Sequence, residues 1–120
     1  MRAILINPFT RTVSDIDPAA GLDDLYEILQ VDLITVMQVG ASHAMILDDE
    51  GLLKSRLEQE YFKLDGMDQP LAGRALILAD EYGENRPATL TLKEVEDKVV
   101  WLDKEKVDPE AWLGWTIVAF

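Results

Sequence analysis

Two short runs of apolar residues require a sheet at the centre of this protein. Residues 3–6 read Ala-Ile-Leu-Ile and stop before Pro8, and residues 75–79 read Ala-Leu-Ile-Leu-Ala and stop at Asp-Glu-Tyr-Gly. A continuous apolar run of this length, bounded by turn residues, is typical of a strand buried on both faces. We therefore predict that segments 2–7 and 73–79 form strands.

The segment between residues 33 and 47 predicts a β-hairpin. Residues 33–39 and 43–47 are rich in apolar residues, and the short sequence Gly-Ala-Ser separates them. Two apolar runs joined by a short turn that contains Gly usually form paired antiparallel strands. We therefore expect both runs to lie side by side in the sheet.

A first helix is expected after a polar, turn-rich connection over residues 8–21. Apolar side chains then recur at the i, i+3, i+4 and i+7 spacing of one helical face. These side chains are Leu22, Leu25, Tyr26 and Leu29. Asp23, Asp24 and Glu27 fall on the other side, near the positive end of the helix dipole.

Capping-box spacing, in which Ser or Thr precedes Glu by three residues, indicates two later helices. Thr91 and Glu94 predict one helix start, and Ser55 and Glu58 predict another. The first of these helices has an apolar face of Leu92, Val95, Val99 and Leu102, and the second one of Leu57, Tyr61 and Leu64. A strand that continues the hairpin would also fit the segment after Ser55.

These segments predict an α+β fold in a single domain over residues 1–120, with a mainly antiparallel or mixed sheet of about four to six strands packed against two or three helices. A chain of 120 residues is long enough for one core and too short for two independent ones. It contains no Cys, which excludes a disulfide scaffold, a thiolate zinc site and a cysteine nucleophile.

The formal net charge is −12, and most of it comes from one third of the sequence. Residues 12–53 contain nine acidic residues and no Lys or Arg, whereas residues 54–120 contain fourteen acidic and nine basic residues. Like charges repel unless the fold separates them or a basic partner neutralises them. Nucleic acid and anionic membranes are not expected as direct ligands, because both are polyanions that bind basic surfaces.

The chain carries no signal for export or membrane insertion. No stretch approaches the roughly 18 apolar residues of a membrane span. The N-terminus also lacks the basic region and long apolar run of a signal peptide. We therefore expect a soluble cytoplasmic protein.

The acidic turns 48–50 (Asp-Asp-Glu) and 80–81 (Asp-Glu) raise the alternative of a Mg²⁺ or Ca²⁺ site, if the fold brings them together. Acidic residues beside Gly are, however, ordinary turn residues, and the first turn lacks the ligand spacing of an EF-hand. We therefore expect no metal and no cofactor.

Catalytic motifs are absent from the sequence. His43 is the only His, and Ser42 precedes it, but neighbouring residues of a strand point to opposite faces and are not expected to form a nucleophile–base pair. A lone His in a strand is more often a partly exposed structural residue. No Gly-x-Ser-x-Gly, phosphate-loop or dinucleotide motif occurs. We expect that the protein is not an enzyme and has no catalytic residues.

The C-terminal segment is uncharged and aromatic, with Trp112, Trp115 and Phe120. It predicts a last strand of the sheet, with alternate residues on opposite faces. The alternative is that these three side chains dock on a partner or on a second copy of the chain, since Trp is favoured at interface centres.

Segments 47–52 (Leu-Asp-Asp-Glu-Gly-Leu) and 71–77 (Leu-Ala-Gly-Arg-Ala-Leu-Ile) carry a resemblance to a known family. Over roughly residues 2–80 the chain resembles an uncharacterised domain-of-unknown-function family that is common in phage and plasmid-borne proteins. The chain departs from that family at residues 31–33 (Val-Asp-Leu), where two glycines are usual. The resemblance implies a small α+β domain from a mobile element and supplies no catalytic residues.

We therefore expect a non-enzymatic acidic protein that binds a basic or nucleic-acid-binding host protein and inhibits or modulates it, as an anti-restriction or anti-CRISPR protein would, with a surface that imitates DNA phosphates. The expected contact residues are all acidic: Asp15, Asp17, Asp23, Asp24, Glu27, Asp48, Asp49 and Glu50. The alternative is a small ligand-binding or homodimeric accessory domain without catalysis.

Overall fold

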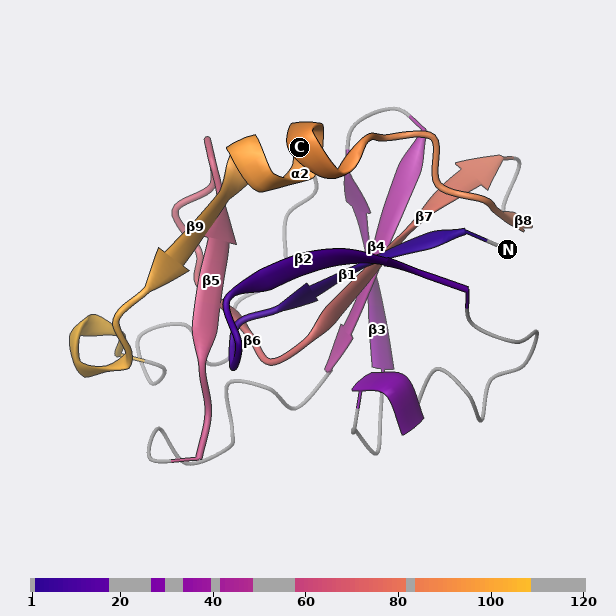
Figure 1. Ribbon diagram of the computed structural model, residues 1–120. Helices are drawn as coiled ribbons and strands as arrows, with labels where there is room; N and C mark the ends of the chain where they lie inside the picture. Colours follow the sequence, from indigo (N-terminus) through magenta and orange to yellow (C-terminus); the bar gives the residue numbers. More distant parts are fainter. Residues whose placement is uncertain are drawn as a thin grey trace.

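The two apolar runs form adjacent strands in the computed structural model of the protein (Figure 1). Strand β1 (Ala3–Asn7) pairs antiparallel with β7 (Ala75–Glu81), and Ile4 lies opposite Ile77. Both predicted strands are confirmed. The structure describes residues 2–17, 27–29, 34–39, 42–48, 58–81 and 84–108.

The predicted hairpin is also confirmed. Strand β3 (Ile34–Val39) pairs antiparallel with β4 (His43–Asp48), and Val39 lies opposite His43. Strand β4 pairs with β7 along its other edge and is buried over its whole length. The apolar character of β4 therefore follows from its position between two other strands.

The segment expected to be an irregular connection contains a strand instead. Strand β2 (Thr12–Ile16) pairs with β1 and forms one edge of the sheet. Only Val13 and Ile16 of its five residues are apolar, and they pack against different core clusters on the two faces of the sheet. An edge strand is only partly buried and can therefore carry polar residues. The polar sequence of β2 is the reason why it gives no strand signal. The sheet order is β2-β1-β7-β4-β3, and β8 (Glu84–Arg86) also pairs with β7.

A second sheet has the order β6-β5-β9. It consists of β6 (Leu71–Ala72), β5 (Tyr61–Leu64) and β9 (Val99–Leu102). The short helix expected through Tyr61 and Leu64 is wrong at these residues, and residues 51–57 lie outside the described residues. The strand alternative is correct in type, but β5 joins the second sheet and does not extend the hairpin.

Helix α2 (Leu92–Lys98) begins where the capping box predicts. The Thr91 side chain accepts a hydrogen bond from the Glu94 backbone N–H at 3.1 Å. The helix ends at Lys98, so the expectation that its apolar face continues through Val99 and Leu102 is wrong. Both residues pair with β5. A 3₁₀ turn, η2 (Lys104–Lys106), follows β9.

The α+β prediction is wrong, because the described residues are mostly β. They form a six-stranded and a three-stranded antiparallel sheet, with α2 as the one longer helix. Of the first predicted helix, only residues 27–29 are described, and they are helical. The other residues of that helix and the C-terminal segment lie outside the described residues.

The larger core cluster lies between the two sheets. Ile4, Met45 and Ile77 of the six-stranded sheet pack with Phe62 of β5 and with Val95 of α2. Figure 1 shows β5 and β9 on one side of the crossing strands and α2 along the top. A second cluster, on the other face of the six-stranded sheet, includes the buried side chain of Leu29.

Candidate functional site

Asp15 is the expected partner-binding residue with the best-defined surroundings. It lies on β2, and its Oδ1 accepts a hydrogen bond from Nε of Arg2 at 2.7 Å. Nη1 of the same Arg2 donates to the carbonyl oxygens of Ala88 and Leu90, at 2.8 and 2.7 Å. The Asp15 side chain is 49% exposed, so a partner can reach it. Its charge is, however, partly neutralised by a fixed guanidinium.

The other expected contact residues have different positions. Asp17, which directly follows β2, and Glu27 are exposed. Asp48 is only 5% exposed, because it is the last residue of the buried strand β4, and this burial removes its carboxylate from the surface that a partner could reach. Four of the expected contact residues lie outside the described residues: Asp23, Asp24, Asp49 and Glu50.

The two strand residues that begin the acidic turns, Asp48 and Asp80, lie far apart. In the register of β4 and β7, Leu47 lies opposite Ala75 and His43 lies opposite Ala79. Asp48 and Asp80 are therefore at opposite ends of this strand pair, about 20 Å apart along the strands. Among the described residues, no group of three His, Asp or Glu side chains could hold a metal ion.

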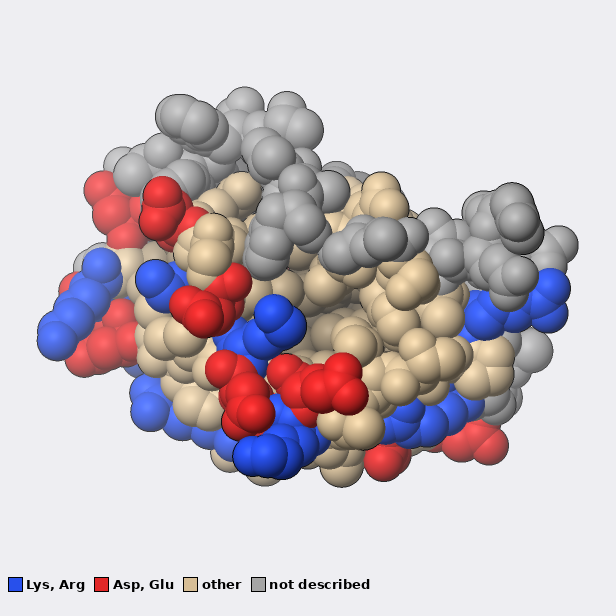
Figure 2. All heavy atoms as spheres, turned by 90° about the horizontal axis from the view of Figure 1, so that it is seen from above, with Lys and Arg blue, Asp and Glu red and all other residues tan. Residues whose placement is uncertain are grey.

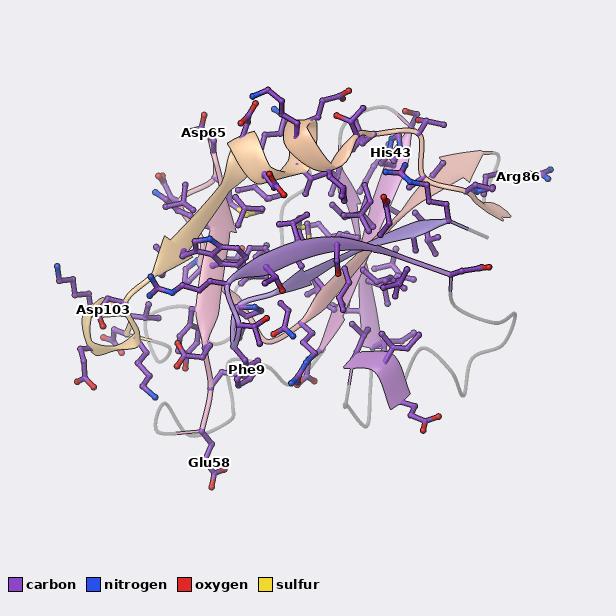
Figure 3. The ribbon with its side chains drawn as sticks, viewed as in Figure 1. Phe9, His43, Glu58, Asp65, Arg86 and Asp103 are labelled. Carbon is purple, nitrogen blue, oxygen red and sulfur yellow. The ribbon has the colours of Figure 1, made fainter. Side chains whose placement is uncertain are left out.

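His43 forms a buried polar link between β4 and the segment before α2 (Figure 3). Its Nε2 lies 3.2 Å from both the backbone N and the Oγ1 of Thr89, and its Nδ1 lies 3.1 Å from Oγ of Ser42. A backbone N–H can only donate, so Nε2 accepts and the neutral ring carries its hydrogen on Nδ1. His43 therefore donates to Ser42 and has no free lone pair to activate it as a nucleophile.

Two expectations about His43 are corrected. The side chain is 5% exposed, not partly exposed. Ser42 and His43 do touch, because Ser42 lies in the turn before β4, where strand alternation does not apply. Burial lowers the pKa of His43 below its usual value of 6.5, and the negative charge of Glu94 opposes this shift. The ring is therefore neutral at pH 7.

The surface around α2 carries charges of both signs. Figure 2, which views the molecule from the side of α2, shows Asp and Glu atoms beside Lys and Arg atoms. On the helix itself, Nζ of Lys93 lies 3.7 Å from Oδ2 of Asp97. This face therefore does not form a continuous acidic surface.

Two hollows flank Trp101 of β9, and sequence reasoning missed them. One has a volume of about 450 Å³, and its lining includes Lys63, Asp103 and Lys106. The other has a volume of about 360 Å³, and its lining includes Arg11. The helical spacing predicted from Leu92 to Leu102 spans Trp101, so it gives no signal for a partly exposed aromatic residue on a strand.

Phe9 and Arg74 form a cation–π contact at the turn between β1 and β2. Phe9 is 41% exposed, and the Arg74 guanidinium carbon lies 4.5 Å from the centre of its ring. Figure 3 shows Phe9 at the turn that joins β1 and β2. The cation thus covers one face of the partly exposed ring.

The expected C-terminal contact residues Trp112, Trp115 and Phe120 lie outside the described residues, so their role as a strand or a docking segment stays a prediction. No helix within the described part of the chain is long and apolar enough to cross a membrane.

Comparison with known proteins identifies a family and no activity. No curated protein and no solved structure matches the chain. The model of one family, a domain of unknown function, matches residues 1–102, from the N-terminus to the end of β9. The expected resemblance to an uncharacterised family is therefore confirmed at that level. The chain belongs to the domain-of-unknown-function family DUF3846.

Proposed function

We propose that this protein is a non-enzymatic binding protein that docks on a basic, nucleic-acid-handling protein and inhibits or modulates it. The observation that carries the proposal is the segment 12–53, with nine acidic residues and no basic residue. We further propose a phage or other mobile element as its source, since small accessory proteins of such elements often act by covering a host protein.

The accessible acidic residues support this proposal. Asp15, Asp17 and Glu27 have exposed side chains, whereas buried Asp48 is left out of the proposed contact surface. Asp15 retains half of its exposure, although Arg2 holds it in place. A partner that brings its own arginines would compete with Arg2 for this carboxylate.

The size of the charge suits steering better than full imitation of DNA. The molecule is 35 Å long, and duplex DNA of that length carries about 20 charges. The net charge of −12 is thus about half that of the duplex. Such a field accelerates encounter with a basic surface, and salt weakens the effect.

Charge reversal at two positions tests the proposal. The variant Asp17→Lys with Glu27→Lys changes the acidic segment, and the control Glu96→Lys with Glu105→Lys makes the same change in net charge at two exposed positions elsewhere. Each protein is used to capture partners from host lysate, and the association rate of a purified partner is then measured at low and high salt.

The proposal expects a nucleic-acid-binding partner whose association with the first variant is about tenfold slower at low salt. The control variant should associate at nearly the wild-type rate. Equal effects of the two variants, or a partner whose association is independent of salt, would reject the acidic segment as the contact surface.

The hollow beside Trp101 favours a second candidate function, that of a small-ligand-binding domain without catalysis. Its volume of about 450 Å³ is within the range of small-molecule sites. It combines the Trp101 side chain with charged residues of both signs: Lys63, Lys106, Asp68, Asp103 and Asp108. Screening small polar metabolites of either charge for a rise in melting temperature tests this function. A rise that persists in Trp101→Ala would place the ligand elsewhere.

A further inference from the structure

Strand β3 is an edge strand that lacks the usual protection against pairing. It pairs with β4 over six consecutive residues without a bulge, and β4 is its one strand neighbour among the described residues. Residues 33–47 contain no Asp, Glu, Lys or Arg, although 28% of the chain is charged. Natural edge strands are usually blocked by charges, Pro or bulges, and β3 has none of these.

The middle of β3 presents an apolar side chain to solvent. Val36 is 63% exposed, the highest value among the large hydrophobic residues described. Its neighbour Met37 points to the opposite face and is buried in the larger core cluster. Pairing along the free edge would therefore cover Val36 without disturbing the core.

Two other edge strands, β2 and β9, are less suited to pairing. Strand β2, at the opposite edge of the same sheet, carries Asp15 in an ion pair with Arg2. Strand β9 is only four residues long and lies between Lys98 and Asp103. The charge-free edge of β3 is thus the most open of the three.

We propose that β3 pairs antiparallel with β3 of a second copy of this chain, about a two-fold axis at Val36. In an antiparallel pair, the side chains of two directly opposed residues point to the same face of the sheet. A sheet that continues across the axis therefore pairs even-numbered residues with even-numbered ones and odd-numbered residues with odd-numbered ones. Val36 then lies opposite Val36 of the second copy, Ile34 opposite Gln38, and Thr35 opposite Met37.

A second copy fits this edge because the register places no charge against a like charge. Strand β3 offers no carboxylate to a basic partner. In a second copy, however, the exposed Val36 side chain can pack against the equivalent Val36 across the two-fold axis. The dimer is weak, since five opposed pairs bury far less than the roughly 1,200 Å² of a stable interface. Salt strengthens it, because each copy carries a net charge of −12.

Single-cysteine crosslinking tests the register, since the chain has no native Cys. In Val36→Cys the two thiols meet at the axis, at the Cα separation of about 4.5–5.5 Å that a disulfide accepts. In the control Gln38→Cys the equivalent residues are about 13 Å apart along the strands and cannot be bridged. Both proteins are incubated with a mild oxidant and analysed on a non-reducing gel.

Sedimentation at increasing protein and salt concentration supplies the second measurement. Wild type and Val100→Lys, which changes an exposed valine on β9, should dimerise more as salt rises, whereas Val36→Lys stays monomeric with an unchanged circular dichroism spectrum. Efficient crosslinking of Val36→Cys alone supports the proposal. A monomeric wild type, equal crosslinking of both cysteine variants, or dimerisation of Val36→Lys overturns it. Binding of a basic partner is weakened by salt, so the two proposals fail independently.

Discussion

Nε2 of His43 accepts a hydrogen bond from the backbone N–H of Thr89, which is 3.2 Å away and 46 positions later in the sequence. The bond connects the buried strand β4 to the segment that leads into α2. A protonated ring would carry a hydrogen on Nε2 and could no longer accept it. The link therefore depends on a neutral His43.

Acidification should weaken the fold through His43. Its pKa in the folded protein lies below 6.5, so the unfolded chain takes up the proton more readily. The stabilisation is therefore complete above about pH 6.5 and decreases as the pH falls toward the folded-state pKa. The loss reaches at most about 1.4 kcal/mol per pH unit. Urea unfolding at a series of pH values measures it.

The variant His43→Gln separates this effect from the titration of the carboxylates. Near neutral pH the variant should be less stable than wild type by about 1–3 kcal/mol, because it disturbs buried hydrogen bonds. The difference should shrink as the pH falls below about 6.5. Stability curves that stay parallel over this range would mean that the pKa of His43 is the same in the folded and the unfolded protein.

Arg2, which is half-buried, should be important for stability. Its guanidinium holds Asp15 and the carbonyl oxygens of Ala88 and Leu90 at the same time. A lysine keeps the charge but cannot reproduce this planar set of donors. We expect Arg2→Lys to lower the free energy of unfolding by about 1–3 kcal/mol in urea denaturation.

Arg11→Lys is the matched control for Arg2→Lys. Arg11 is exposed and lies in the turn between β1 and β2, so the change should stay within about 0.5 kcal/mol. Equal losses in both variants would show that the contacts of Arg2 contribute nothing specific.

The strands that the sequence predicts are those whose own residues indicate a strand, whatever strand they pair with. The segments 3–6, 44–47 and 75–79 are apolar throughout, so burial on both faces accounts for them. Strand β2 is different, because its polar residues form a strand only where β1 is available for pairing. The signal for β2 is thus tertiary and is absent from its own five residues.

Helix α2 illustrates the same division. Thr91 and Glu94 mark its start through a local hydrogen bond, which spacing alone can predict. Its end has no glycine, and Val99 and Leu102 keep the helical spacing while they pair with β5. Pairing with a distant strand outweighed the local periodicity.

The candidate sites depended on register in a similar way. The sequence shows that acidic residues are numerous. Only the pairing of β4 with β7 shows that Asp48 and Asp80 lie at opposite ends of this strand pair. The burial of Asp48 follows from the same pairing. The hollows beside Trp101 combine residues from β5, β9 and the turn before β2, which no local pattern connects.

Removing the cap of α2 should cost about 1 kcal/mol. In Thr91→Ala the Glu94 backbone N–H loses its acceptor, and the Glu94 carboxylate loses the hydroxyl 3.2 Å away. Thr91→Ser keeps both contacts and should be close to wild type. Urea denaturation measures the difference, and similar losses for Ala and Ser would exclude the hydroxyl as its cause.

The last prediction concerns Phe62 and Trp101, whose rings meet edge to face with centroids 6.4 Å apart. Phe62 is fully buried, and Trp101 packs against the same core cluster while it borders both hollows. Such an arrangement contributes about 0.5–1.5 kcal/mol beyond burial, because the positive edge of one ring meets the negative face of the other.

A double-mutant cycle of Phe62→Leu and Trp101→Leu should recover this coupling from urea denaturation. The control cycle combines Phe62→Leu with Val107→Ala, which belongs to a different core cluster, and should be additive within about 0.5 kcal/mol. A coupling in the aromatic cycle no larger than in the control would mean that Phe62 fills space without orienting Trp101. In that case, neither hollow would owe its shape to the ring pair.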